Sequence, residues 1–258
     1  MKMSRGKRNV LFAGAISCAM LFGIGNTMAY FTENAVKTNV FTTGDLDIGL
    51  KETEWSPEEN DGKNMYPGYT TYKNPTVKNI TSSKNGEEPC YVRMSVDILD
   101  SAGKPVKDPD ALTLIYKTIY FDSSFSGGYD KNDGTSSGLI QDRVPGYNLA
   151  QLSGYPMVNP LWSKDTTRST ASQLVFNYMG EKGDGILNIG EESTLFTNIV
   201  IPTDWNQTQM QKIGDYQLKV TAQAIQSKGF ATQSEAYKML DEEIKGGTLQ
   251  EITREASN

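Results

Sequence analysis

Two segments of the chain alternate apolar and polar residues with a period of two, and this pattern constrains the fold more than any other feature. They are residues 92–98 and 216–224. Successive side chains of a β-strand point to opposite faces, so each segment predicts a strand with one buried face. The residues expected on the buried faces are Val92, Met94, Val96 and Ile98 in the first segment and Tyr216, Leu218, Val220, Ala222 and Ala224 in the second.

Shorter segments also have strand character. Leu46, Ile48 and Leu50 alternate with polar residues or glycine, and residues 173–180 form a further candidate strand. Residues 193–202 predict another strand, which ends at a proline because proline cannot donate to a central ladder.

One hairpin is predicted over residues 77–98. Val77 and Ile80 are expected on one side of its first strand, and Asn85-Gly86 is a dipeptide suited to the turn. The apolar run at residues 111–121 is compatible with either a short helix or a pair of buried strand segments.

Two helices are predicted near the end of the chain. The first begins near Thr203 or Asp204 and stops at Gly214. The second begins after Phe230, where Thr232 and Glu235 have the spacing of a capping box. Its apolar residues at helical spacing are Ala236, Met239, Leu240 and Ile244, followed by Gly246-Gly247.

A further helical turn or two is expected from Thr248 to Glu251, which again have capping-box spacing. The helix after Phe230 is interpreted as lying over the sandwich or over its open edge. The alternative is a helix that binds a partner.

Together these elements predict an all-β protein: a two-sheet, jelly-roll-like β-sandwich with short peripheral helices and a helical C-terminal extension. The expected divisions are a signal peptide (1–29), an N-terminal segment (30–43), the sandwich (44–230) and the extension (231–258).

The first 29 residues are expected to be a secretory signal peptide. Four basic residues precede an uncharged, mostly apolar run at residues 10–24, and Ala29 is a small residue at the expected cleavage site before Tyr30. The run is short for a membrane span, which needs about 20 residues. An uncleaved anchor and a lipoprotein modified at Cys18 are the alternatives.

Composition excludes several functional classes. The full chain has a net charge of −6, and cleavage would remove basic residues only, so we expect no nucleic-acid partner. The chain has no histidine, which rules out Ser-His-Asp and Cys-His nucleophiles and argues against a zinc site, since zinc ligands are mostly His and Cys. After cleavage Cys90 would be the single cysteine; we interpret it as buried, with an intermolecular disulfide as the alternative.

No segment of the chain carries a recognisable catalytic frame, so no enzymatic activity and no cofactor is predicted. Residues 130–134 resemble a calcium loop but lack its full spacing and its closing glutamate. Opportunistic calcium binding at Asp130, Asn132 and Asp133 is therefore a weak alternative to a polar turn. Trp55, Trp162 and Trp205 are interpreted as packing residues.

Residues 30–42 have the properties of a strand that could complete a sheet. Val36 and Val40 share one parity, while Phe31, Ala35 and Phe41 share the other, and Tyr30 would be the first residue after cleavage. No proline interrupts the segment. It could pair within its own subunit as an ordinary first strand, or add to the sheet of a neighbouring subunit by donor-strand complementation.

Three blocks of the chain resemble the TasA/camelysin family of secreted biofilm-matrix proteins from Gram-positive bacteria. They are AYFTENAVKTNVFTTGDLDIGL, PGYTTYKNPTVKNITSSKNGEEPCYVRMSVDI and LFTNIVIPTDWNQTQMQKIGDYQLKVTAQAIQSKGF. The sequence AYFT is similar to the cleavage signature of a dedicated, SipW-type signal peptidase. The resemblance spans both ends of residues 10–230.

This resemblance implies a jelly-roll domain that is secreted and polymerises head-to-tail into extracellular fibres, with itself as main partner, accessory matrix proteins as further partners, and no membrane contact after cleavage. A monomeric surface adhesin, or an accessory protein that anchors or caps fibres, is the alternative. Camelysins carry a metalloprotease label, which the absence of histidine argues against transferring.

Overall fold

The structure is a computed structural model that describes residues 36–38, 46, 48–52, 62, 64–81, 88–122, 156–246 and 251–253. Its strands form one seven-stranded sheet and two three-stranded sheets. The large sheet holds β1 (Val36–Thr38), β5 (Cys90–Asp100), β7 (Trp162–Lys164), β8 (Gln173–Tyr178), β9 (Ile186–Leu187), β12 (Tyr216–Gln226) and β13 (Glu251–Thr253).

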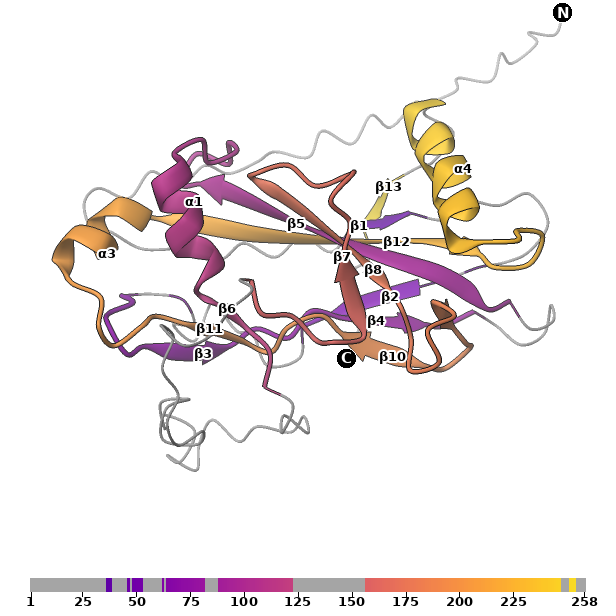
Figure 1. Cartoon of the computed structure of the whole chain (residues 1–258), viewed down its shortest axis with the longest axis horizontal. Helices are drawn as coiled ribbons and strands as arrows, with labels where there is room; N and C mark the ends of the chain where they lie inside the picture. Colours follow the sequence, from indigo (N-terminus) through magenta and orange to yellow (C-terminus); the bar gives the residue numbers. More distant parts are fainter. Residues whose placement is uncertain are drawn as a thin grey trace, which may run out of the picture.

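The first small sheet holds β2 (Ile48–Lys51), β4 (Thr76–Asn79) and β10 (Glu192–Thr194), and the second holds β3 (Thr70–Tyr72), β6 (Ile119–Tyr120) and β11 (Asn198–Val200). Both small sheets run below the large one in the view of Figure 1. A single core cluster joins Met94 of the large sheet to Val77 and Ile199 of the two small sheets. The described residues therefore form two packed layers, which confirms the all-β class.

The two long alternating segments are the adjacent strands β5 and β12, as their patterns predict. They pair antiparallel over their whole length, from Tyr216 opposite Asp100 to Gln226 opposite Cys90. The apolar residues predicted on their inner faces are all buried. Leu46, Ile48 and Leu50 are buried as well, and residues 173–178 form the predicted strand β8.

The predicted hairpin over residues 77–98 is wrong. Strand β4 pairs with β2 and β10, whereas β5 pairs with β12, β8 and β9, so the two strands lie in different sheets. Val77 is fully buried while Ile80 is 43% exposed, so they do not share a face. An alternating pattern reports which side of a strand is buried but not which strand lies beside it. The Asn85-Gly86 turn lies outside the described residues.

Two segments, residues 111–121 and 193–202, each contain parts of two elements. The run at residues 111–121 is mostly helix α1 (Pro109–Tyr116), with Asp108 as its N-cap, and then strand β6. The single strand predicted over residues 193–202 is wrong, because it is split between β10 and β11 in different small sheets.

Helix α3 (Gln207–Ile213) begins later than the sequence predicts. Its N-cap is Asn206, not Thr203 or Asp204, and Gln209 completes the capping box. Asn206 accepts hydrogen bonds from Thr208 N and Gln209 N, which satisfies two of the amides that a helix start leaves open. The predicted stop at Gly214 is confirmed.

Helices α1 and α3 lie at one end of the sandwich, and α4 (Gln233–Gly246) lies on the far side of the large sheet from the small sheets (Figure 1). Trp162 and Trp205 are buried packing residues, and Cys90 is a buried free thiol. In the part of the chain that the structure describes, no helix is both long and apolar enough to cross a membrane. The signal-peptide residues and Trp55 lie outside that part.

Candidate functional site

The described residues cover only part of the β12 edge of the large sheet. One side of β12 pairs with β5 along its whole length, but the other side pairs with β1 only at Thr221, Ala222 and Gln223. Among the described residues, no strand lies beside Tyr216–Val220 on that side. Unpaired N–H and C=O groups along a strand edge favour the addition of another strand.

Strand β1 comes from the N-terminal segment and runs parallel to β12, with Val36 opposite Thr221 and Thr38 opposite Gln223. Its other side pairs antiparallel with β13, with Val36 opposite Thr253. Segments from near both ends of the chain therefore meet at this edge (Figure 1). The further helical turn predicted from Thr248 to Glu251 is wrong, because Glu251–Thr253 is a strand.

Of the residues predicted for the donor segment, the structure describes one. Val36 belongs to β1, which pairs with β12 of the same chain. Tyr30, Phe31, Ala35, Val40 and Phe41 lie outside the described residues, as does Ala29 of the cleavage site. Pairing of β1 within its own chain is one of the two arrangements that the sequence leaves open. A β1 strand from a neighbouring copy would meet the same partner strand.

Helix α4 covers the outer face of the large sheet beside this edge. Ala236, Tyr237 and Leu240 form a second buried cluster with Tyr91 of β5 and Ile225 of β12. The Tyr237 hydroxyl also donates a 2.6 Å hydrogen bond to the Val92 carbonyl oxygen. The interpretation of this helix as one that lies over the sandwich is therefore confirmed.

The predicted apolar face of α4 is only partly right. Ala236 and Leu240 are buried, but Met239 is 43% exposed and Ile244 is 37% exposed. Tyr237 was missed, although it lies three residues before Leu240, and this spacing places both on one side of a helix. One half of the predicted capping box is confirmed, because Glu235 N donates to Thr232 Oγ1; the Glu235 side chain accepts from Ala231 N instead of Thr232 N.

A network of charged side chains holds α4 on the sheet. Asp241 accepts a 2.7 Å bond from Arg93 Nη1 of β5 and another of 2.7 Å from Arg168 Nη2, and Arg168 Nη1 lies 2.8 Å from Asp165. Burial opposes ionisation of Asp241, but the bonds from Arg168 and Arg93 outweigh it and hold the pKa of the carboxyl below its ordinary value of 3.8. Both guanidinium groups also lie over the Tyr237 ring.

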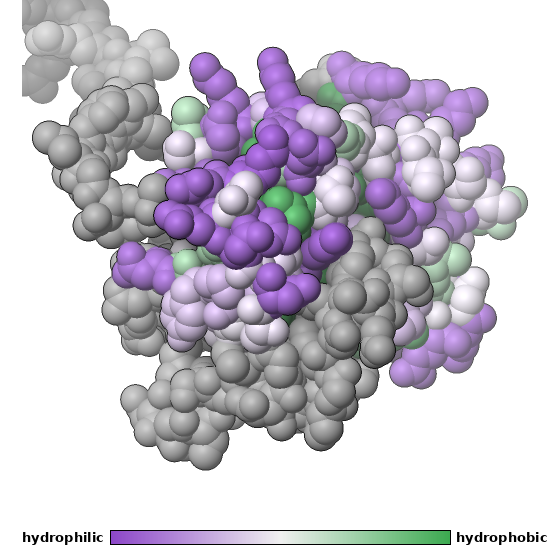
Figure 2. Space-filling model, turned by 60° about the vertical axis from the view of Figure 1, so that its left-hand side comes forward, coloured by the Kyte–Doolittle hydropathy of each residue, from purple (hydrophilic) through white to green (hydrophobic). Residues whose placement is uncertain are grey.

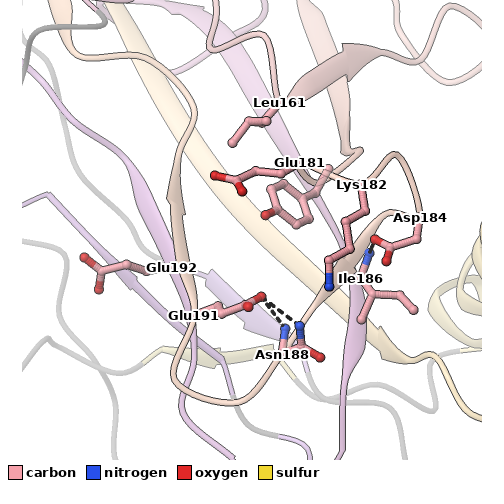
Figure 3. A pocket seen from close by; sticks show the side chains of 9 residues that line it. Leu161, Glu181, Lys182, Asp184, Ile186, Asn188, Glu191 and Glu192 are labelled. Carbon is pink, nitrogen blue, oxygen red and sulfur yellow. Dashed lines mark hydrogen bonds between the residues drawn. The ribbon is translucent and has the colours of Figure 1, made fainter.

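An acidic hollow of about 270 Å³ lies elsewhere on the surface, beside β8, β9 and β10 (Figure 3). Three of its four carboxylates have partners: Glu191 accepts from Asn188, Asp184 accepts from the amide of Ile186, and Glu192 lies 3.0 Å from Lys51. The described residues contain no group of His, Cys, Asp and Glu that could hold a metal ion. The weak calcium site at Asp130, Asn132 and Asp133 lies outside them.

Comparison of the chain with protein-family models, curated proteins and solved structures finds no match. The resemblance to the TasA/camelysin family therefore rests on the three sequence blocks.

Proposed function

We propose that the mature chain is a structural subunit of extracellular biofilm-matrix fibres. Each copy donates its N-terminal segment, residues 30–43, to the β12 edge of the next copy, and the sandwich is of jelly-roll type. The observation that supports this proposal is that, among the described residues, one side of a long core strand is paired by three residues of an N-terminal strand.

The energetics favour pairing of such a strand over a free tail. Each additional net hydrogen bond contributes about 0.5–1.5 kcal/mol, and each buried valine or phenylalanine about 1.5–3 kcal/mol. Ordering a free tail costs about 1–2 kcal/mol per residue, so roughly ten paired residues offset that cost. A strand that pairs with the next copy makes a head-to-tail contact, and such contacts produce filaments when they do not close into a ring.

Cleavage between Ala29 and Tyr30 by a SipW-type signal peptidase would act as the switch. Before cleavage the segment is tethered to the apolar signal peptide and cannot thread onto a neighbour. After cleavage it has a free end. The mature subunit would then be secreted to the matrix or cell surface of a Gram-positive bacterium.

A second candidate is an accessory protein that anchors or caps fibres, or a monomeric adhesin. The observation that favours it is β13, which pairs with the outer side of β1 and is therefore the edge strand of the large sheet. A capped edge would accept a neighbour at one end of the molecule only. A camelysin-type protease is not proposed, because the chain has no histidine.

The test compares a chain that begins at Tyr30 with one that begins at Gly44, each incubated and examined by electron microscopy. Filaments from the longer chain alone support a fibre subunit, and monomers from both support the accessory role. Chelator-sensitive cleavage of casein by either chain would restore the protease hypothesis.

A matched pair of variants in the longer chain refines the test. Lys37→Pro removes a backbone donor within β1 and should abolish filaments, whereas Lys37→Ala should leave them intact. Filaments from Lys37→Pro would show that polymerisation does not use this strand.

A further inference from the structure

The register of β1 on β12 says where the start of the mature chain would lie, if the proposed strand pairing is correct. Val36, Lys37 and Thr38 lie opposite Thr221, Ala222 and Gln223. Parallel strands advance together, so each earlier residue pairs with the residue one earlier in β12. Continued in this way, the register sets Ala35 beside Val220, Asn34 beside Lys219, Glu33 beside Leu218, Thr32 beside Gln217, Phe31 beside Tyr216 and Tyr30 beside Asp215.

This extended register matches the two faces of β12. Phe31 and Ala35 fall beside Tyr216 and Val220, which are buried, whereas Thr32 and Asn34 fall beside the half-buried polar residues that alternate with them. Two charged residues are exceptions: Glu33 falls beside buried Leu218, and Lys37 lies opposite buried Ala222. An inward-pointing charge on an edge strand is a common way to keep that strand soluble while it is unpaired.

A groove lies where this register ends. It has a volume of about 380 Å³, and its lining includes Met65, Met210, Ile213 and Asp215. Met65 and Met210 are half-buried and pack against the core, and Ile213 is 6% exposed. Methionine adapts its shape and makes favourable sulfur–aromatic contacts, so this lining suits an aromatic ring.

The number of residues between the expected cleavage site and β1 fits the distance from the groove to the paired part of β12. Six residues, 30–35, lie between the expected cleavage site and β1, and the sixth residue before Thr221 in the sequence is Asp215, which lines the groove. Both strands rise by about 3.3 Å per residue, so the mature chain would end at the groove without slack.

The charge of the new chain end is opposite to that of a residue in the groove. Cleavage leaves a free α-amino group on Tyr30, with an ordinary pKa of about 7.7–8.0, so it is largely protonated at neutral pH. Asp215 is among the residues that line the groove, and the register places Tyr30 beside it. Figure 2 brings the end of the molecule with α1 and α3 toward the reader and shows small hydrophobic patches among hydrophilic side chains. A small groove of this kind is large enough for an aromatic side chain at the end of a strand, and a broad apolar face is not needed.

We propose that this groove is the receptor for the freed amino terminus of the donor strand, taking the aromatic residues Tyr30 and Phe31 and pairing the new α-amino group with Asp215. The inference rests on the proposed function and adds to it. This contact would make strand pairing depend on cleavage. In the uncleaved chain, residue 30 has an amide nitrogen in place of the charged α-amino group, and the signal peptide would continue through the groove. Cleavage would therefore set both the timing and the register of pairing.

The register is tested with a cysteine pair in the otherwise unchanged mature chain. Thr32→Cys and Gln217→Cys lie directly opposite in the proposed register and should form a disulfide under mild oxidation. Thr32→Cys with Lys219→Cys is the matched control: it lies two residues out of register, at a Cα separation beyond the roughly 7 Å that a disulfide can bridge. A disulfide in the control pair and not in the test pair would overturn the proposed register.

The contact at the chain end is tested on the background of the Thr32–Gln217 cysteine pair. N-terminal acetylation removes the cation, and Asp215→Asn removes the anion; each should slow formation of the disulfide about threefold. The two changes together should slow disulfide formation no further than either change alone, because each removes the same ion pair. Unchanged rates, or fully multiplicative losses, would overturn the contact between the amino terminus and Asp215.

The aromatic anchor has its own variants. Tyr30→Ala and Phe31→Ala should each lower the disulfide yield, whereas Asn39→Ala, outside the groove in this register, should not. Filaments without the disulfide would refute the groove and leave the fibre proposal standing. The disulfide within monomers, without filaments, would support the groove and refute the fibre proposal.

Discussion

Lys73 Nζ lies 2.7 Å from Glu52 Oε2, with both side chains almost completely buried at 1% and 2% exposure. Glu52 directly follows β2 of one small sheet, and Lys73 lies in the link from β3 of the other small sheet to β4. The second carboxylate oxygen, Glu52 Oε1, is buried and has no hydrogen-bond partner. This ion pair therefore connects the two small sheets within the lower layer of the sandwich.

Removal of one member of this pair should destabilise the protein strongly. Lys73→Met leaves the Glu52 carboxylate buried without compensation, which costs about 3–5 kcal/mol in the free energy of unfolding. Urea denaturation followed by tryptophan fluorescence measures the loss. The double variant Glu52→Leu/Lys73→Met should recover most of it. A single variant no less stable than the double would contradict this account.

The network around Asp241 should make α4 sensitive to acid. Asp241 and Asp165 both have a pKa below the ordinary 3.8, so they bind protons less readily in the folded state than in the unfolded state. Their contribution to stability is complete above that value and is lost as the pH falls through the lower, folded-state pKa. Asp241→Asn should cost about 1–3 kcal/mol at neutral pH.

The measurement is the free energy of unfolding of the natural chain and of Asp241→Asn between neutral pH and about pH 2.5, below the ordinary pKa range of Asp. The difference between the two should shrink as the pH falls. A difference that stays constant across the whole range would mean that the charge of Asp241 does not hold the helix.

The Tyr237 hydroxyl should contribute to stability through its bond to the Val92 carbonyl. Tyr237→Phe keeps the ring in its cluster but removes the 2.6 Å hydrogen bond, at a cost of about 1 kcal/mol. Thermal unfolding measures the change. Tyr66→Phe is the control, because Tyr66 is 59% exposed and should be neutral. Equal effects of both changes would assign no special role to the buried hydroxyl.

Cys90 should be inert in the folded protein. Burial raises the pKa of its thiol to about 12, so the reactive thiolate is scarce at neutral pH. Iodoacetamide should modify the native mature chain very slowly and the urea-unfolded chain rapidly, as followed by mass spectrometry. Fast labelling of the native chain, or a disulfide-linked dimer under oxidising conditions, would favour the alternative of an intermolecular bridge.

Truncation of the chain after Gly246 should loosen β1. Strand β13 pairs with the side of β1 that faces away from β12, so its removal leaves β1 held on one side only. Amide hydrogen exchange at Val36–Thr38 should then become faster. If the fibre proposal is correct, filaments should also appear sooner. Unchanged exchange at these amides would show that β13 does not stabilise the edge.

Local patterns in the sequence predicted well where the side chains themselves carry the information. The alternation in β5 and β12 correctly separated buried from exposed residues, because a strand against a core must place its apolar side chains on one face. Thr232 and Glu235 correctly marked the start of α4, because capping depends on side chains within one turn. Ile80 was wrongly grouped with Val77, because residues three apart in a strand point to opposite faces, and Met239 was wrongly grouped with the buried residues of α4, since it is 43% exposed.

The sequence by itself determined the β class, the inner faces of the long strands and the start of the final helix. Only the tertiary structure decided which strands are neighbours: that β4 lies apart from β5, that β1 runs parallel to β12, and that β13 pairs with the outer side of β1. The physical reason is that strands are joined by backbone N–H and C=O groups, which are the same at every residue except proline. Side-chain order therefore determines which face of a strand is buried, while the choice of partner emerges only when the whole core is packed.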